Sequence, residues 1–360
     1  GIEVDPSWSS DGSRILYANQ RGLFSVPASG GPPRQEAPAS GGIISAAWSP
    51  DGNTIAYVAG DTIWNRHVEA ALAAHRPQVI VLNAGKATFI GLDDVIAMPG
   101  RTPAYVGGLR DDQFAFLEAY LPTLPKDRLL VIGVHIPLFD SFREADRERL
   151  FALLHGFPHV LVLSGHTHTQ RHVFHGRIHE YNVGAACGAF WSGVDDENGV
   201  PDAAMADGTP NGHARLQVGQ GGKYALQWHN ARDPADATIG LHAPKVLRRG
   251  AYPAWGVYAN VYMGMDDTVV EYRIDDGDWS PMRKVLRPDP RLLVENVRDD
   301  LATGLRGWDR SPEAEPSTHL WRGALPTDLA AGEHVVEVRY PDPWRGEQRA
   351  TIRYRLDPAG

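Results

Sequence analysis

The chain has 360 residues, of which 42% are hydrophobic and 22% are charged, and its formal net charge at pH 7 is -9. This length favours two or three domains, and the net negative charge argues against a nucleic-acid partner, because phosphate binding needs a basic surface. No run of 18 or more apolar residues is present, so no transmembrane helix is expected, and the single cysteine, Cys187, excludes an intrachain disulfide.

Residues 1–63 contain an internal repeat. DPSWSSDGSRILYA and SAAWSPDGNTIAYV place Trp8 and Trp48 40 residues apart, each followed by an Asp-Gly turn and an alternating strand. A period near 40 residues with this turn predicts propeller-like β hairpins, and the repeat resembles the TolB-type β-propeller repeat. About one and a half blades are present, whereas a propeller closes with four or more.

Residues 64–100 change character and predict a short α/β segment. Asn65–His75 is expected to form a short helix, and Val79–Leu82 a strand that ends in an Asn-Ala-Gly turn. The stretch RPQVIVLNAGKATFIG resembles a piece of a metallo-β-lactamase-fold hydrolase. The H-x-H-x-D-H run that such enzymes need is absent, so no activity is inferred from this stretch.

Residues 101–232 predict a coherent α/β segment. An amphipathic helix is expected at Asp111–Leu121, and a second helix, capped by Ser141, is expected to run through Leu154. Buried strands are expected at Leu129–Val134 and Val160–Leu163. Two parallel strands joined by a helix form a βαβ unit, which places its chemistry at the carboxyl ends of the strands.

Three histidines follow these two strands. His135 comes directly after the first strand, and His166 and His168 lie in the Gly-His-Thr-His turn after the second. A single histidine is usually a surface or hydrogen-bonded core residue, but this spacing can bring three imidazoles together as metal ligands. Alternate residues after a strand can also point to two different ions, as in a dinuclear centre that binds a phosphoryl group.

Residues 233–360 predict a β-sandwich accessory domain. Along 335–340, Val335, Glu337 and Arg339 lie on one side of the expected strand and Val336, Val338 and Tyr340 on the other. Turn signals, among them an Asp-Gly pair, separate the short strands. The Pro- and Asp-rich stretch 287–316 is expected to be a surface excursion. The fold class predicted for the whole chain is therefore a partial α/β core, preceded by propeller-like hairpins and followed by a β-sandwich.

Several motifs together carry a resemblance to a known family: VIGVHIPLFD, VLSGHTHTQ, NVGAACGAFWSG, DGTPNGHA and the Trp-Ser-Pro-Met of 279–282. Residues from about 101 to 360 resemble the calcineurin-like metallophosphoesterases, in the bacterial subgroup with an extra C-terminal β domain. The resemblance implies hydrolysis of phosphate mono- or diesters with iron, zinc or manganese. His135 and His166 would bind one metal and His168 the other. It also implies a periplasmic or secreted location, although the chain shows no signal peptide and a cytoplasmic location stays open.

The chain departs from this family in the first half of the catalytic core. The family's D-x-H, G-D-x-x-x-D and G-N-H-D/E motifs are absent. The nearest stand-in ligand is Asp61, but the end of a propeller strand is the better explanation of this residue. Without a bridging carboxylate, the three histidines are expected to hold one metal tightly at most. The chain is therefore expected to be an impaired phosphoesterase. The alternative is a catalytically inactive binding or scaffold protein that meets protein partners through its β modules.

Further polar residues follow the histidine turn. Asn182, Trp191 and Asn211 are expected near the substrate pocket, by resemblance to the family, although tight packing of small residues also explains this stretch. His172, His175 and His179 are expected to have surface or hydrogen-bonding roles, because they do not share a strand face with His166 and His168.

Overall fold

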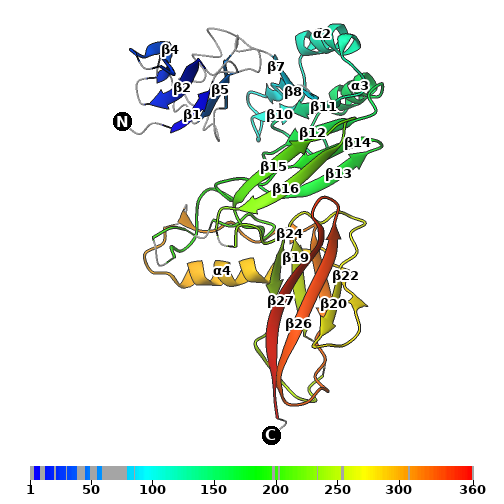
Figure 1. Ribbon diagram of the computed structural model, residues 1–360. Helices are drawn as coiled ribbons and strands as arrows, with labels where there is room; N and C mark the ends of the chain where they lie inside the picture. Colours follow the sequence, from blue (N-terminus) through cyan, green and yellow to red (C-terminus); the bar gives the residue numbers. More distant parts are fainter. Residues whose placement is uncertain are drawn as a thin grey trace. The chain divides into compact units, whose positions relative to one another are not determined.

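The computed structural model describes residues 4–8, 13–19, 22–29, 31–38, 45–48, 55–58 and 79–358, apart from 85, 197–198, 202, 233, 253–254 and 307–308. The chain divides into two compact units, Gly1–Gln78 and Val79–Gly360 (Figure 1). The expected helix Asn65–His75 and the stand-in ligand Asp61 lie outside the described residues. No described helix combines the length and the apolar character that crossing a membrane requires.

The first unit contains two antiparallel sheets. Four strands pair in the order β1-β2-β3-β4, and two more form a separate pair: β1 (Val4–Trp8), β2 (Arg14–Asn19), β3 (Gly22–Pro27), β4 (Arg34–Pro38), β5 (Ser45–Trp48) and β6 (Ile55–Val58). Trp8 pairs with Ile15, and Trp48 pairs with Ile55 in the same way. The sequence repeat thus forms the same hairpin register twice, while its assignment to a propeller stays a prediction.

A six-stranded sheet, here called the core sheet, opens the second unit in the order β13-β14-β12-β11-β8-β7. Its strands are β7 (Val79–Ala84), β8 (Ala87–Leu92), β11 (Leu129–Gly133), β12 (Val160–Ser164), β13 (Arg171–His175) and β14 (Ile178–Asn182). The four inner strands are parallel, and β7 and β13 are antiparallel at the edges. The predicted parallel pairing of the strands before His135 and His166 is therefore confirmed, and part of the 64–100 segment belongs to this same sheet.

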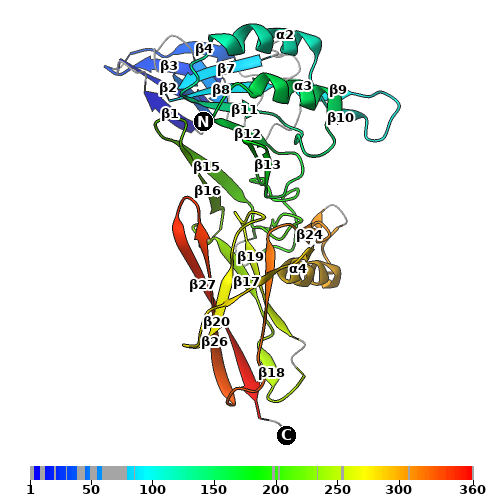
Figure 2. The same cartoon turned by 90° about the vertical axis from the view of Figure 1, so that its right-hand side faces the viewer.

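Both faces of the core sheet are covered. Helices α2 (Asp111–Tyr120) and α3 (Glu144–Leu154), with a short 3₁₀ turn η1 (Leu121–Thr123), lie on one face (Figure 2). Leu130 and Ile132 of β11 pack with these helices, whereas Leu129 and Val131 pack toward the hairpin of β15 (Gly212–Val218) and β16 (Tyr224–Asn230). Burial on both faces explains why these strands are continuous apolar runs.

The prediction that Ser141 caps helix α3 is wrong. The helix begins at Glu144 with Arg143 as its N-cap, and no side chain caps it. Ser141 instead has a φ of 50°, and its carbonyl accepts a hydrogen bond from the Gly107 N–H of β10 (Tyr105–Gly107), which pairs with β9 (Val95–Ala97). Ser141 is therefore part of a turn that is hydrogen-bonded to the β9–β10 hairpin, and helix α3 begins only at Glu144.

Two sheets that share one hydrophobic core make up residues 239–357, here called the C-terminal β unit. One sheet has the order β17-β19-β25-β22, with β17 (Ile239–His242), β19 (Gly256–Val261), β25 (Leu320–Ala324) and β22 (Arg283–Lys284). The other has the order β18-β27-β26-β20-β21, with β18 (Val246–Arg248), β27 (Gly346–Asp357), β26 (Gly332–Asp342), β20 (Glu271–Ile274) and β21 (Ser280–Pro281). Val336, Val338 and Tyr340 of β26 face the core, as their alternation predicts.

The stretch expected to be an irregular surface excursion contains a helix. Helix α4 (Pro290–Leu301) follows the short strand β23 (Arg287–Pro288), which pairs with β24 (Pro316–Ser317). Asp289 is its N-cap and accepts a hydrogen bond from the Arg291 N–H, and Pro290 occupies the first turn. An Asp-Pro start of this kind is a recognised helix signal, and it outweighs the turn-rich composition of the region.

Candidate metal centre

The core sheet brings two of the three predicted ligands into contact. His135 follows β11 and His166 follows β12, and His135 Nε2 lies 3.1 Å from His166 Nδ1. The two loops are also joined by their backbones, because the Gly165 N–H donates to the His135 carbonyl over 3.1 Å. His168 follows His166 by two residues, and the centroid of its ring lies 5.4 Å from that of Phe190.

The histidine turn has an uncommon backbone. His166 and His168 have φ values of 68° and 51°, in the left-handed region that side chains other than glycine rarely adopt. The Thr167 N–H donates to the Gly165 carbonyl over 2.7 Å, so His166 is the central residue of a strained γ-turn. Strain of this kind persists only where surrounding contacts hold it, and it is typical of functional sites.

The electrostatic surroundings favour a neutral imidazole at His166. Burial and the charge of His168 lower its pKa, and together they outweigh the opposite effect of the nearby Asp140 carboxylate. The neutral form of imidazole is the one that binds metals, so the lowered pKa is compatible with the predicted ligand role of His166. Asp140, five residues after His135, is a site residue that the sequence analysis did not single out.

A second missed residue supports the His135 loop. Asp94 follows β8, is buried, and accepts hydrogen bonds of 2.8 Å from the backbone N–H groups of both His135 and Ile136. Burial raises its pKa to about 6, although the backbone hydrogen bonds act in the opposite direction. The Asp-Asp pair after an apolar run was the available signal, but its partner is 41 residues away in the sequence.

Two buried side chains of β14 form hydrogen bonds with the His135 loop and the histidine turn. Glu180 accepts hydrogen bonds from the Leu138 N–H at 2.8 Å and from Ser164 Oγ at 2.9 Å. Asn182, with none of its surface exposed, donates to Thr167 Oγ1 over 2.6 Å and to the Thr169 carbonyl over 2.7 Å. The structure therefore places Asn182 beneath the histidine turn, where it positions the loop.

The C-terminal β unit also reaches the histidine turn. Asp207 is buried and accepts a hydrogen bond of 2.7 Å from the Gln170 N–H, two residues after His168. Its same oxygen lies 3.0 Å from Nε2 of His319, which precedes β25. Nδ1 of His319 lies 2.7 Å from Oδ1 of Asn260. A line of polar contacts thus runs from the turn into the C-terminal β unit.

The other two predicted pocket residues have different positions. Asn211 is buried and donates to the Ala186 carbonyl over 2.9 Å, so it braces the loop before Cys187. Trp191 is 50% exposed and has a φ of 55°. Asn211 is thus a support for this loop, and Trp191 lies at its surface.

A bound metal fits part of this arrangement. Two imidazole nitrogens that bind one tetrahedral zinc ion at about 2.0–2.1 Å lie roughly 3.3 Å apart. The measured separation of 3.1 Å between His135 and His166 is close to this, and it also suits a hydrogen bond. Nδ1 of His168 is buried without a hydrogen-bond partner among the described residues. Those residues contain no convergent group of three histidine, cysteine or carboxylate side chains, and the contact described here joins two of the three candidate ligands.

The second histidine cluster has hydrogen-bonding roles, as predicted. Nδ1 of His172 lies 2.9 Å from Nε2 of His179, whose Nδ1 lies 2.6 Å from the Tyr224 hydroxyl. His175 bonds to Glu180 over 2.8 Å. Burial lowers the pKa of His179 to about 4 and that of His172 well below its usual value. Both rings are therefore buried and neutral rather than on the surface.

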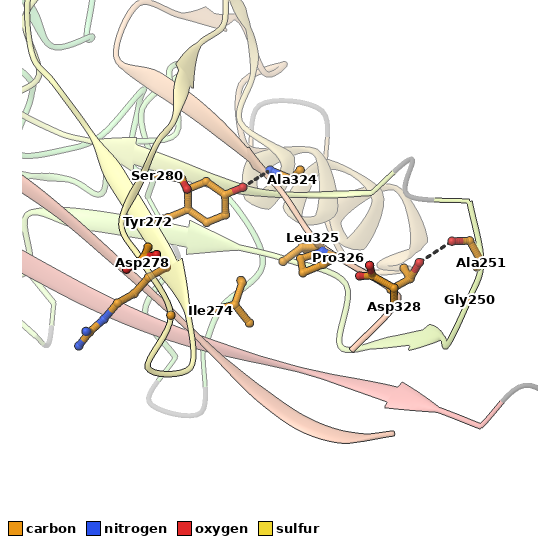
Figure 3. Close-up of a pocket in the computed structure, with 13 residues that line it drawn as sticks. Gly250, Ala251, Tyr272, Ile274, Asp278, Ser280, Ala324, Leu325, Pro326 and Asp328 are labelled. Atoms are coloured by element: carbon orange, nitrogen blue, oxygen red, sulfur yellow. Dashed lines mark hydrogen bonds between the residues drawn. The ribbon is translucent and has the colours of Figure 1, made fainter. Parts of the chain in front are cut away.

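A separate hollow lies in the C-terminal β unit (Figure 3). Its volume is about 650 Å³, and its lining includes Tyr272, Asp278, Ser280, Leu325 and Asp328. The Tyr272 hydroxyl is occupied by the Ala324 N–H at 3.1 Å. None of the three candidate metal ligands lines this pocket, so it is a different feature from the metal centre.

Comparison with known proteins identifies the class of the C-terminal part. Residues 180–348 match the family model described as the C terminal of calcineurin-like phosphoesterase. The predicted resemblance to the calcineurin-like metallophosphoesterases is confirmed there, and that family generally uses divalent metals. The match begins in β14 and includes Asn182, Asp207 and His319, whereas the candidate metal ligands precede it. No curated protein matches the chain.

Proposed function

We propose that this protein is a metal-dependent phosphoesterase with impaired activity in the present chain. The observation that carries the proposal is the contact of His135 with His166 at the carboxyl ends of two parallel strands, next to a matched phosphoesterase C-terminal domain. The core sheet then corresponds to the second half of an α/β metallophosphoesterase core. Propeller-like hairpins precede this core, and a β-sandwich follows it.

The chain's own residues account for binding and orientation. His135 and His166 would hold a divalent or trivalent ion of iron, zinc or manganese, with His168 beside them. Such an ion, when bound, lowers the pKa of a coordinated water and polarises a phosphoryl oxygen. Asp94, Glu180 and Asn182 hold the two ligand loops through backbone and side-chain hydrogen bonds.

The proposed impairment follows from the ligand set. The D-x-H, G-D-x-x-x-D and G-N-H-D/E motifs are absent from the sequence, so the bridging carboxylate and the usual catalytic histidine are missing. Asp140 supplies negative charge near His166 but belongs to the same half of the site. We therefore expect one tightly bound metal at most and slow hydrolysis of phosphate mono- or diesters. A periplasmic or secreted location is part of this proposal.

Substitution of His166 tests the function. Purified wild-type protein should contain up to one metal ion per chain by elemental analysis and should hydrolyse para-nitrophenyl phosphate esters slowly. The His166→Ala variant should lose metal and hydrolysis together, whereas His213→Ala, on the exposed side of β15, should keep both. Two tightly bound metals with rapid turnover would contradict the proposed impairment, and turnover unaffected by His166→Ala would contradict the site.

A second candidate function is a binding or scaffold module without catalysis. The pocket in the C-terminal β unit favours it, because this hollow exists independently of the histidines (Figure 3). Under this alternative, wild type and His166→Ala show no hydrolysis, and binding of a protein partner to the β modules survives the substitution.

A further inference from the structure

Aromatic side chains from two separate segments border the histidine group. Phe190 lies 5.4 Å from His168 between ring centroids. Tyr105 of β10 meets His166 edge-on at 5.6 Å, with its hydroxyl 3.4 Å from Nε2. Trp191 follows Phe190 directly. The candidate metal centre therefore has an apolar, aromatic margin.

Phe190 and Trp191 are held in an unfavourable backbone conformation. Their φ values are 94° and 55°, and their exposed fractions are 77% and 50%. A large ring that packs in a core gains hydrophobic stabilisation, which can offset the cost of a strained backbone. These two rings remain exposed to solvent and lack much of that stabilisation. Core packing therefore does not explain why two consecutive aromatic residues adopt this conformation.

The surrounding chain is built to keep this loop in place. On the upstream side, a Cβ on Gly188 would lie 2.1 Å from the Ala203 carbonyl oxygen, so this approach requires glycine. On the downstream side, the Gly193 N–H donates to the Asp309 carbonyl over 2.8 Å, and the Val194 N–H donates to Asp299 of α4 over 3.0 Å. The C-terminal β unit and its helix thus hold the loop that carries both rings, and within this loop Phe190 lies beside His168.

We propose that Phe190 and Trp191, with Tyr105, form a binding surface for a planar aromatic group of the phosphate ester, such as an aryl or nucleobase moiety. This inference rests on the proposed phosphoesterase function and specifies its substrate class. A phosphoryl group beside His135 and His166 places the organic part of the ester near these rings. Flat π systems stack on exposed aromatic side chains, whereas a small alkyl group gains little from them.

Binding of two non-hydrolysable probes tests this surface. Full-length protein is titrated calorimetrically with phenylphosphonate and with methylphosphonate in the presence of Mn²⁺. Wild type should prefer the phenyl probe by about tenfold. Phe190→Ala and Trp191→Ala should reduce the preference to about twofold or less, while affinity for methylphosphonate stays unchanged.

Matched variants separate stacking from folding. Phe190→Tyr keeps a ring and should keep the preference, whereas Phe190→Leu keeps apolar volume and should lose it. Phe174→Ala removes a comparably exposed ring from β13 and should change nothing. Equal affinity of wild type for the two probes, a preference that survives both alanine variants, or no binding of either probe overturns the inference.

The proposed function fails on a different measurement. Absence of ester hydrolysis with an intact, ring-dependent phenyl preference contradicts the phosphoesterase function alone. Hydrolysis that requires His166, with equal binding of the phenyl and methyl probes, contradicts the aromatic surface alone.

Discussion

At the residue scale, the histidine turn has a strained backbone at two of the proposed metal ligands, His166 and His168. His166 occupies a left-handed conformation at the centre of a γ-turn, and its neighbours hold it there through the Asn182 and Gly165 hydrogen bonds. The backbone conformation of the turn therefore fixes where the His166 side chain starts. Pre-organisation of this kind is what the proposed ligand role of His166 requires.

Glycine should relieve this strain. We expect His166→Gly to be about 1 kcal/mol more stable than His166→Ala, because glycine adopts a positive φ without a Cβ clash. Urea unfolding of both variants measures the difference. At His213, in a regular part of β15, the order should reverse, since glycine weakens an ordinary strand. If the free energy of unfolding of His166→Ala equals or exceeds that of His166→Gly, the turn is unstrained.

At the element scale, the loops that follow β11 and β12 are held by buried polar side chains from neighbouring strands. Asp94 comes from the end of β8, and Glu180 and Asn182 come from β14. Parallel strands bring these residues to one edge of the sheet, where loop backbone groups need hydrogen-bond partners. The same edge thus carries the proposed ligands and the groups that position their loops.

Removing the Asp94 carboxylate should destabilise the His135 loop. Asp94→Ala leaves two backbone N–H groups without their acceptor, and we expect a loss of about 2–4 kcal/mol in the free energy of unfolding together with weaker metal binding. Asp93→Ala is the matched control, because Asp93 makes an exposed ion pair with Arg110 at 2.8 Å. Such a pair contributes about 1 kcal/mol or less. Similar losses for both variants would contradict the role given to Asp94.

At the scale of the whole second unit, Asp207 connects the histidine turn to the C-terminal β unit. Burial acts to raise its pKa, but the His319 charge and the hydrogen bonds from His319, Gln170 and Thr209 outweigh burial and lower it below 3.8. The folded state therefore holds the proton of Asp207 less tightly than the unfolded state does. The resulting stabilisation is fully present at pH values well above the unfolded pKa of 3.8 and is lost as the pH falls through the folded pKa.

Acid unfolding should report this connection. The difference in unfolding free energy between wild type and Asp207→Asn should be constant from pH 7 to about pH 5 and should shrink at lower pH. Urea unfolding across this range measures it. Asp266→Asn, at a side chain that is 98% exposed, should show no comparable pH dependence. A difference that grows on acidification would contradict the depressed pKa of Asp207.

Short-range signals accounted for much of the core sheet. The apolar runs before His135 and His166 predicted two parallel buried strands, and alternation predicted which residues of β26 share one side, because each pattern reflects neighbours only a few residues apart. The two loop histidines at one sheet edge followed from the same signals. Helix α4 was not predicted. The Pro- and Asp-rich composition of 287–316 indicated a surface excursion, whereas the Asp-Pro pair at the start of α4 is a local helix signal.

The sequence by itself determined the parallel pair of strands before the histidines and the resemblance of the C-terminal part to calcineurin-like phosphoesterases. Only the tertiary structure decided how the site is held and bordered. Asp94 reaches His135 across 41 residues, and Asp207 reaches His319 across 112. Pairs of this kind form when packing brings distant segments together and buried backbone groups require partners, and no local periodicity encodes that requirement.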